Sequence, residues 1–127
     1  MKLRIDMTSD LPAYRQIVDG LRIMLVSGDL KVGSVLPSVR RMALDLGVHF
    51  NTVAEAYRSL AEEGWLDLKH GRSAVVIERN TPPADNLKVR EFAQRLRALA
   101  AQMRAVGVPV NRIRAELQSV AEELLIP

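Results

Sequence analysis

The chain of 127 residues contains no cysteine, only two histidines and few aromatic residues. Without cysteine it forms no disulfide, no thiolate zinc site and no thiol nucleophile. His49 and His70 belong to no cluster with metal-ligand spacing, and their surroundings give no support to a Ser/His/Asp triad. The glycines are isolated at the ends of expected elements instead of forming a phosphate-cradling loop. We therefore expect a protein that is not an enzyme and that holds neither a metal nor a cofactor.

Long apolar runs and a strong excess of one charge are also missing. No apolar run reaches the ~18 residues of a membrane span, and the N-terminus lacks the apolar stretch of a signal peptide. We expect a cytoplasmic protein without a membrane partner. The net charge is +3, and residues 1–80 carry 11 Lys and Arg against 10 Asp and Glu. This balance does not by itself indicate a nucleic acid partner, so that inference depends on local patterns.

Two short helical patterns meet at a glycine within residues 36–61. Ser38 can cap the first helix, because its hydroxyl accepts a free amide hydrogen, and Gly47 suits the left-handed residue that ends it. The second helix, about 50–63, buries residues at helical spacing, namely Val53, Ala56, Tyr57 and Leu60. Its other face is polar and carries Asn51, Thr52, Glu55, Arg58 and Ser59. This arrangement predicts a helix-turn-helix, a motif that places the second helix in the DNA major groove.

Segments on both sides complete the expected domain. An amphipathic helix is predicted from Pro12 to Val26, and brief strands could form at 2–6 and 34–36. After Gly64, strand patterns flank a basic turn, which predicts a hairpin. A hairpin directly behind a recognition helix is a wing, and its tip suits phosphate or minor-groove contacts through Lys69, His70, Gly71 and Arg72. The alternative is a solvated turn that happens to be basic; the preceding helix-turn-helix favours the wing.

Pro82 and Pro83 separate this region from a C-terminal tail, because two prolines cannot lie in a helix interior. We expect a winged helix-turn-helix DNA-binding domain at 1–80, a linker at 81–84 and a two-helix tail at 85–127. The fold class is thus mainly α with a small β-hairpin wing, followed by an α-helical hairpin.

The tail carries two apolar stripes that alternate intervals of three and four residues, interrupted by Gly107 and Pro109. The first stripe consists of Val89, Phe92, Leu96, Leu99, Met103 and Val106, and the second of Val110, Ile113, Leu117, Val120 and Leu124. One partner helix of this size cannot hide either stripe fully, so a second copy is the expected cover, which gives a homodimer. The alternative is that both stripes pack onto the N-terminal domain of the same chain, which the Pro-Pro linker disfavours.

Residues 11–77 resemble the winged helix-turn-helix of the GntR family of bacterial transcription regulators. The resemblance rests on separated motifs in the right order: Pro12 to Ile17, Ser27 to Leu30, Leu36 to Arg40, Leu46 to Val48, Asn51 to Val53, Ala56-Tyr57, Leu60, Glu63-Gly64, His70-Gly71 and Val75-Val76. The tail of about forty residues is similar to the YtrA subfamily, whose members carry a short dimerising appendage in place of a large ligand-binding domain.

The resemblance implies roles for individual residues. Arg40 corresponds to a DNA-contacting arginine, Asn51 and Thr52 to the helix start that meets bases or phosphates, and His70-Gly71 to the wing tip. Ser38 fits the helix-opening serine. Two departures follow: His49-Phe50 stands where the family has Ser-Arg, and Gly71-Arg72-Ser73 replaces Gly-x-Gly. A serine cap and a guanine-reading arginine are therefore expected to be missing. Phe50 either touches a thymine methyl group or packs inward, and we favour packing inward.

These observations predict a sequence-specific DNA-binding transcriptional regulator, a repressor that binds an inverted-repeat operator as a homodimer. The predicted DNA-binding residues are Ser38, Arg40, Phe50, Asn51, Thr52, Arg58, Lys69, His70, Gly71 and Arg72. The alternative is a winged-helix protein-interaction module without sequence-specific DNA binding. Whether a small-molecule effector exists stays open at this point.

Overall fold

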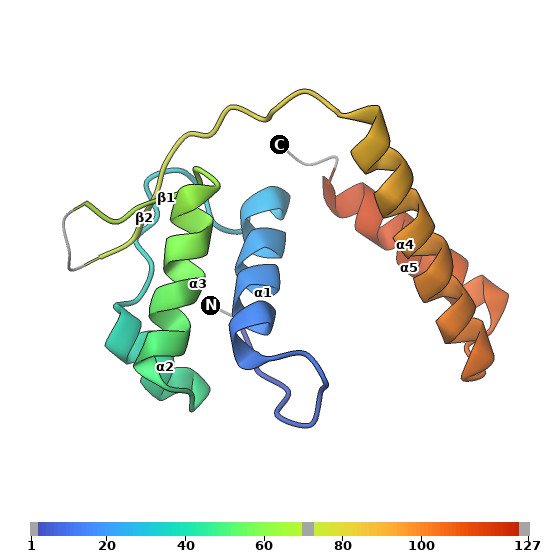
Figure 1. Cartoon of the computed structure of the whole chain (residues 1–127), viewed down its shortest axis with the longest axis horizontal. Coiled ribbons are helices and arrows are strands. Elements are labelled where there is room, and N and C mark those ends of the chain that lie inside the picture. Colours follow the sequence, from blue (N-terminus) through green and yellow to red (C-terminus); the bar gives the residue numbers. More distant parts are fainter. Residues whose placement is uncertain (1–2, 70–72, 125–127) are drawn as a thin grey trace. The chain divides into compact units, whose positions relative to one another are not determined.

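The computed structural model describes residues 3–69 and 73–124. It divides into two compact units, one ending at Arg79 and the other beginning at Asn80. Within the first unit, α1 (Ala13–Ser27) lies beside α3 (Phe50–Glu62), and α2 (Val39–Leu46) packs against α3 (Figure 1). The helix boundaries agree with the apolar periodicity of the sequence to within a residue or two.

The core of the first unit is apolar throughout and comes from every element. Ile17, Leu21, Val53 and Leu60 are almost completely buried, as their spacing predicts, and Tyr14 and Leu46 lie at the core's edge. The other buried members are Val18, Leu25, Leu36, Met42, Ala43, Ala56, Tyr57, Leu66, Ala74 and Val76. Because α3 packs against α1, α2 and β1, the core fixes its position within the domain.

The wing strands are shorter than predicted. β1 (Leu66–Asp67) pairs with β2 (Val75–Val76) in antiparallel register, with Leu66 opposite Val76 and Asp67 opposite Val75. The segment expected as a strand at 34–36 contributes one bridge, between Val35 and Val75. Two-residue strands suffice here because each strand places a buried side chain, Leu66 or Val76, in the core.

The strand suggested for residues 2–6, the N-terminal lead, is absent from the part of it that the structure describes, residues 3–6. The backbone of Asp6 forms hydrogen bonds with the side chain of Gln16 instead of with another strand. The amide of Asp6 donates to Gln16 Oε1 at 2.8 Å, and Gln16 Nε2 donates to the Asp6 carbonyl at 2.9 Å. One glutamine thus anchors the lead to α1.

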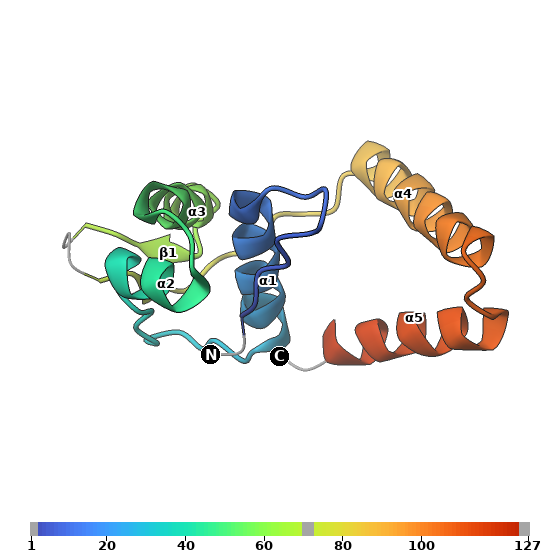
Figure 2. The same ribbon diagram turned by 90° about the horizontal axis from the view of Figure 1, so that it is seen from below.

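The second unit is a helical hairpin made of α4 (Asn86–Ala105) and α5 (Val110–Leu124), whose arms diverge from the turn between them (Figure 2). Asp85 caps α4 by accepting from the Leu87 amide at 2.9 Å, and Gly107 adopts a φ of 96° in the turn. α4 has no buried residue, and α5 has Ile113 alone. Among the described residues, no helix combines the length and apolar character needed to cross a membrane.

Candidate nucleic-acid interface

The recognition helix of the predicted motif begins with a histidine cap. The serine cap is missing as expected, and a histidine replaces it: His49 Nδ1 accepts the Asn51 amide hydrogen at 3.1 Å. An imidazole nitrogen with a lone pair satisfies one of the free donors of a first helical turn, as a hydroxyl oxygen does. Ser38 caps α2 as predicted, with Oγ accepting from the Arg41 amide at 3.1 Å.

Phe50 does not pack inward, so the prediction for this residue is wrong. Its side chain is 49% exposed, and its ring stacks on His49 with 4.6 Å between centroids and 26° between planes. Phe50 shares the helical face of Val53 and Tyr57, but it stands at the first turn, where the core has ended. The capping histidine therefore covers one side of the ring in place of core side chains.

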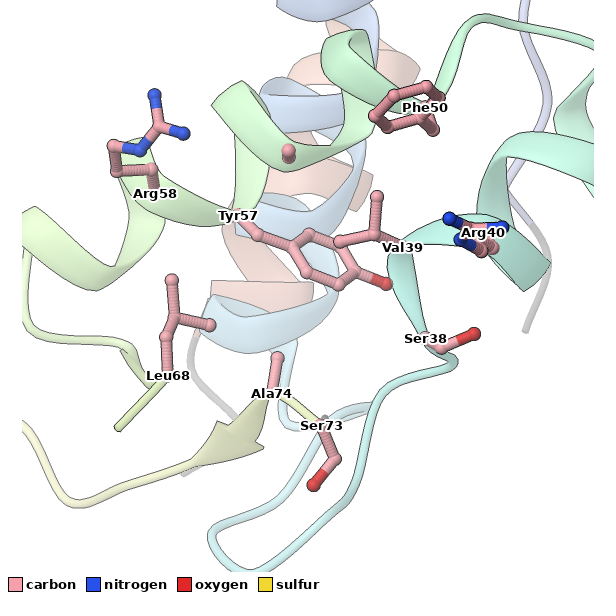
Figure 3. Close-up of a pocket in the computed structure, with 10 residues that line it drawn as sticks. Ser38, Val39, Arg40, Phe50, Tyr57, Arg58, Leu68, Ser73 and Ala74 are labelled. Carbon is pink, nitrogen blue, oxygen red and sulfur yellow. The ribbon is translucent and has the colours of Figure 1, made fainter. Parts of the chain in front are cut away.

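A hollow of about 450 Å³ opens between α2, α3 and the wing strands. Figure 3 shows Tyr57 between Arg40 and Arg58, with Ser73 and Ala74 beneath. The lining consists of Ser38, Val39, Arg40, Phe50, Ala54, Tyr57, Arg58, Leu68, Ser73 and Ala74. Among the described residues, this lining includes two arginines and no carboxylate, which makes the hollow attractive to an anion such as a DNA phosphate.

Tyr57 connects the core to this hollow. Its hydroxyl donates to the Pro37 carbonyl at 2.7 Å, and burial raises the pKa of the phenol above its ordinary value. This hydrogen bond holds the segment before α2 against α3. Periodicity assigned Tyr57 to the core alone; the hydroxyl at the end of a core-facing aromatic ring was the signal for this second role.

The structure brings together only part of the predicted set. Ser38, Arg40, Phe50 and Arg58 line the hollow, whereas the exposed Asn51 and the half-buried Thr52 lie beside it on the first turn of α3. Lys69 is exposed two residues after β1, and its amide donates to Asp67 Oδ1 at 2.9 Å. His70, Gly71 and Arg72, which the sequence places at the wing tip, lie outside the described residues.

Glu55 is the carboxylate among the polar residues that the sequence places on the outer face of the second helix. It is exposed on α3 and does not line the hollow. A glutamate at this position is either a solvated part of the helix exterior or a partner of Arg58 or Ser59. No hydrogen bond or ion pair involves it within the part of the chain that the structure describes, which fits the solvated exterior. Within the same part, no group of acidic and histidine side chains is arranged to hold a metal ion.

Glu63, the residue that caps the C-terminal end of α3, connects that end to α1 and to the residues after the wing. Its carboxylate accepts from Arg22 Nε and from Trp65 Nε1, each at 3.1 Å. The Glu63 carbonyl accepts from Arg79 Nε at 2.6 Å, while the Arg79 guanidinium lies 4.5 Å from the Trp65 ring. The hydrogen bond from Arg22 lowers the pKa of the Glu63 carboxyl, so this link persists at neutral pH. α1, α3 and the residues after the wing are thereby joined.

Comparison with known proteins identifies the family. Residues 13–76 match the model of "Bacterial regulatory proteins, gntR family". The repressor YtrA of Bacillus subtilis is 26% identical over 96% of this chain and 94% of its own length. YtrA of Sulfolobus acidocaldarius, a GntR-family transcription factor of known structure, is 31% identical, covers 94% of this chain and 97% of its own, and superposes with a TM-score of 0.56.

A structure titled as a transcriptional antiterminator from Listeria monocytogenes is 25% identical, has a TM-score of 0.70 and covers 94% of this chain and 90% of its own. These likenesses extend over the tail as well as the helix-turn-helix, and they favour DNA binding over a protein-interaction module. The chain belongs to the GntR family of bacterial regulators, is of the YtrA type, and is a DNA-binding transcriptional regulator.

Proposed function

We propose that this regulator is a homodimeric repressor that binds an inverted-repeat operator, with the 1–80 domain contacting DNA and the 85–127 tail pairing the two copies. The observation that carries the DNA-binding assignment is the hollow directly beside the first turn of α3, whose described lining includes Arg40 and Arg58 and no carboxylate. Repression is supported by the similarity to YtrA of Bacillus subtilis, which is a transcriptional repressor.

The roles of the contacts divide by chemistry. Arg40 and the wing residue Lys69 provide phosphate affinity, because cations neutralise the backbone without reading sequence. Asn51 provides base choice, because an amide can donate to and accept from one adenine edge in the major groove. Ser38 Oγ accepts the capping hydrogen bond, so its hydroxyl hydrogen is the group available to a phosphate oxygen.

The dimer assignment is supported by what the second unit leaves uncovered. Phe92, Leu96 and Leu99 on α4 are 54–56% exposed, and Leu117 and Val120 on α5 are about half exposed. Helices of this kind gain most of their stability by burying an apolar face, and each arm of this hairpin buries almost nothing against the other. A second hairpin with the same stripes is complementary by symmetry and closes a four-helix cluster.

Selection of bound sequences from random duplex DNA tests the proposal. We expect an inverted repeat whose half-sites lie about one DNA turn apart or a multiple of it, because a two-fold dimer presents two recognition helices. Arg40→Ala should weaken specific and random DNA alike and reduce the salt dependence by about one charge. Asn51→Ala should cost roughly 1–3 kcal/mol on the selected site and little on random DNA.

The matched control is Arg41→Ala. Arg41 follows Arg40 in the first turn of α2, but it pairs with Asp45 at 3.3 Å and does not line the hollow. Its removal subtracts the same net charge while leaving the proposed contact in place. If Arg40→Ala and Arg41→Ala have equal effects on affinity and salt slope, the assignment of Arg40 is wrong. If no sequence is enriched from the random pool, the proposed function is wrong.

A further inference from the structure

The first turn of α3 carries an aromatic ring that the core does not use. Phe50 is 49% exposed at the start of the recognition helix, lies next to Asn51 and lines the hollow with Arg40. An isolated exposed phenylalanine needs no explanation on most surfaces. Here it occupies the turn that faces the base edges of the major groove when a helix-turn-helix binds DNA.

The ring is held in place by its neighbour. His49 Nδ1 is fixed by the hydrogen bond from the Asn51 amide at 3.1 Å, so the imidazole cannot turn freely. Phe50 stacks on that imidazole with 4.6 Å between centroids. The capping hydrogen bond restrains the His49 imidazole, and stacking on the imidazole restrains the Phe50 ring. The Phe50 side chain is therefore positioned before DNA binds. A preorganised side chain loses little rotamer freedom on binding.

We propose that Phe50 is a specificity-determining residue that reads the C5-methyl group of a thymine in each operator half-site, and that His49 is its positioning residue. This inference rests on the proposed function. The thymine methyl is the apolar feature among the base edges of the major groove, and an apolar side chain recognises it by contact. The other groups on the base edges are hydrogen-bond donors and acceptors, which a phenyl ring cannot pair with.

Replacing thymine by uracil isolates this contact, since the two bases differ only by that methyl group. The probe is the duplex selected from the random pool, with each thymine changed to uracil in turn. We expect one position per half-site at which the unmodified protein binds about fourfold more weakly, the loss for one buried methyl group. Phe50→Ala should bind the thymine and uracil duplexes equally at that position.

A gain of affinity is expected in the reverse direction. When the same base pair is changed to C·G, methylation of the cytosine at C5 should strengthen binding of the unmodified protein and have no effect on Phe50→Ala. Arg41→Ala is the control for both measurements, since Arg41 lies outside the hollow and should keep the full thymine-to-uracil ratio.

His49→Asn separates the positioning role from helix capping. Asparagine retains a side-chain acceptor suited to the helix N-terminus but has no ring on which Phe50 can stack. We expect a reduced thymine-to-uracil ratio together with unchanged helix content by circular dichroism. An unchanged ratio would overturn the role of His49.

Two outcomes overturn the inference for Phe50 itself. One is that the unmodified protein binds the thymine and uracil duplexes equally at every position while Arg40→Ala still weakens binding, in which case DNA binding stands and the methyl contact does not. The other is that Phe50→Ala retains the full ratio, which assigns the methyl contact to another residue. Failure to enrich any sequence removes both the inference and the proposed function on which it rests.

Discussion

The two units of this protein both contain amphipathic helices, but they bury the apolar faces of those helices to very different extents. In the first unit, the apolar faces of α1 and α3 meet and bury Ile17, Leu21, Val53 and Leu60 almost completely. In the second unit, α4 and α5 carry stripes of equal regularity, yet Ile113 is the one residue of these two helices that is buried. Periodicity therefore shows which face of a helix must be covered, but not what covers it.

The difference has a functional meaning under our proposal. The first unit has a complete core and presents polar and charged groups, which suits a rigid surface that meets DNA. The second unit has an incomplete core that a second copy completes, which suits a connection that exists only in the dimer. The predictions below challenge this contrast, beginning with the largest expected effect.

The largest effect is expected from Leu99→Asp on α4. This carboxylate would lie in the seam, the apolar surface where the hairpins of the two copies meet in the proposed dimer. Burying it there is costly, so the dimer should separate. Operator affinity should then fall by roughly 10²–10⁴, because the second domain is no longer tethered to the first. Titration of the selected duplex measures this loss.

The control for Leu99→Asp is Gln94→Asp. Gln94 is exposed on the opposite side of α4 by the heptad spacing, so it introduces the same charge away from the stripe. The Gln94→Asp variant should bind the operator with an affinity close to that of the unmodified protein. Equal losses for both variants would show that charge on α4, and not disruption of the seam, weakens binding.

The second effect concerns the core of the first unit. Leu60 is completely buried, so Leu60→Ala should destabilise the folded state by about 2–5 kcal/mol. Leu44→Ala on α2, where the side chain is 75% exposed, should change stability by less than about 0.5 kcal/mol. Urea unfolding at one fixed protein concentration compares them, and a similar cost at both positions would contradict the described core.

The third effect is the cap of the recognition helix. His49→Ala removes the acceptor for the Asn51 amide and should cost about 1 kcal/mol of stability. His49→Asn should recover most of that loss because asparagine is a strong capping residue. Urea unfolding again provides the measurement. If alanine and asparagine are equally destabilising, the histidine contributes through stacking and not through the cap.

The smallest effect is pH-dependent and involves Glu63. The folded-state pKa of its carboxyl is lowered below the ordinary value of 4.5, so the stabilisation is present above pH 4.5 and is lost as pH falls through the folded pKa. Glu63→Gln should cost under about 1 kcal/mol at pH 7, and this cost should vanish below that pH window. The exposed Glu62 provides the control through Glu62→Gln, and a cost independent of pH would contradict the link to Arg22.

The sequence predicted the first unit well because local signals and burial agree there. Ser38 begins α2 and Gly47 ends it, as their capping chemistry requires, with Gly47 at a φ of 70°. The strand pattern around Val75 overstated the length of the wing strands, since pairing depends on the partner segment as well as on local preference. The lead at 3–6 was misjudged because the decisive partner, Gln16, lies ten residues away from Asp6.

The candidate site was less predictable for a physical reason. The family's capping serine is absent here, and the ability of His49 to accept an amide hydrogen in its place was overlooked. Once that cap is in place, the exposure of Phe50 follows from its position at the first turn beyond the core. The hollow beside Arg40 depends on the packing of α2, α3 and the wing together, which no single stretch of sequence contains.

Sedimentation equilibrium of the unmodified chain tests the central claim most directly. The account predicts a mass of twice the chain's 14.1 kDa at micromolar concentrations, and the mass of a single chain for Leu99→Asp, with its helix content retained. A single-chain mass for the unmodified protein at every concentration would contradict the account. So would a Leu99→Asp variant that stays dimeric, because the exposed stripe of α4 would then not be the surface that joins the two copies.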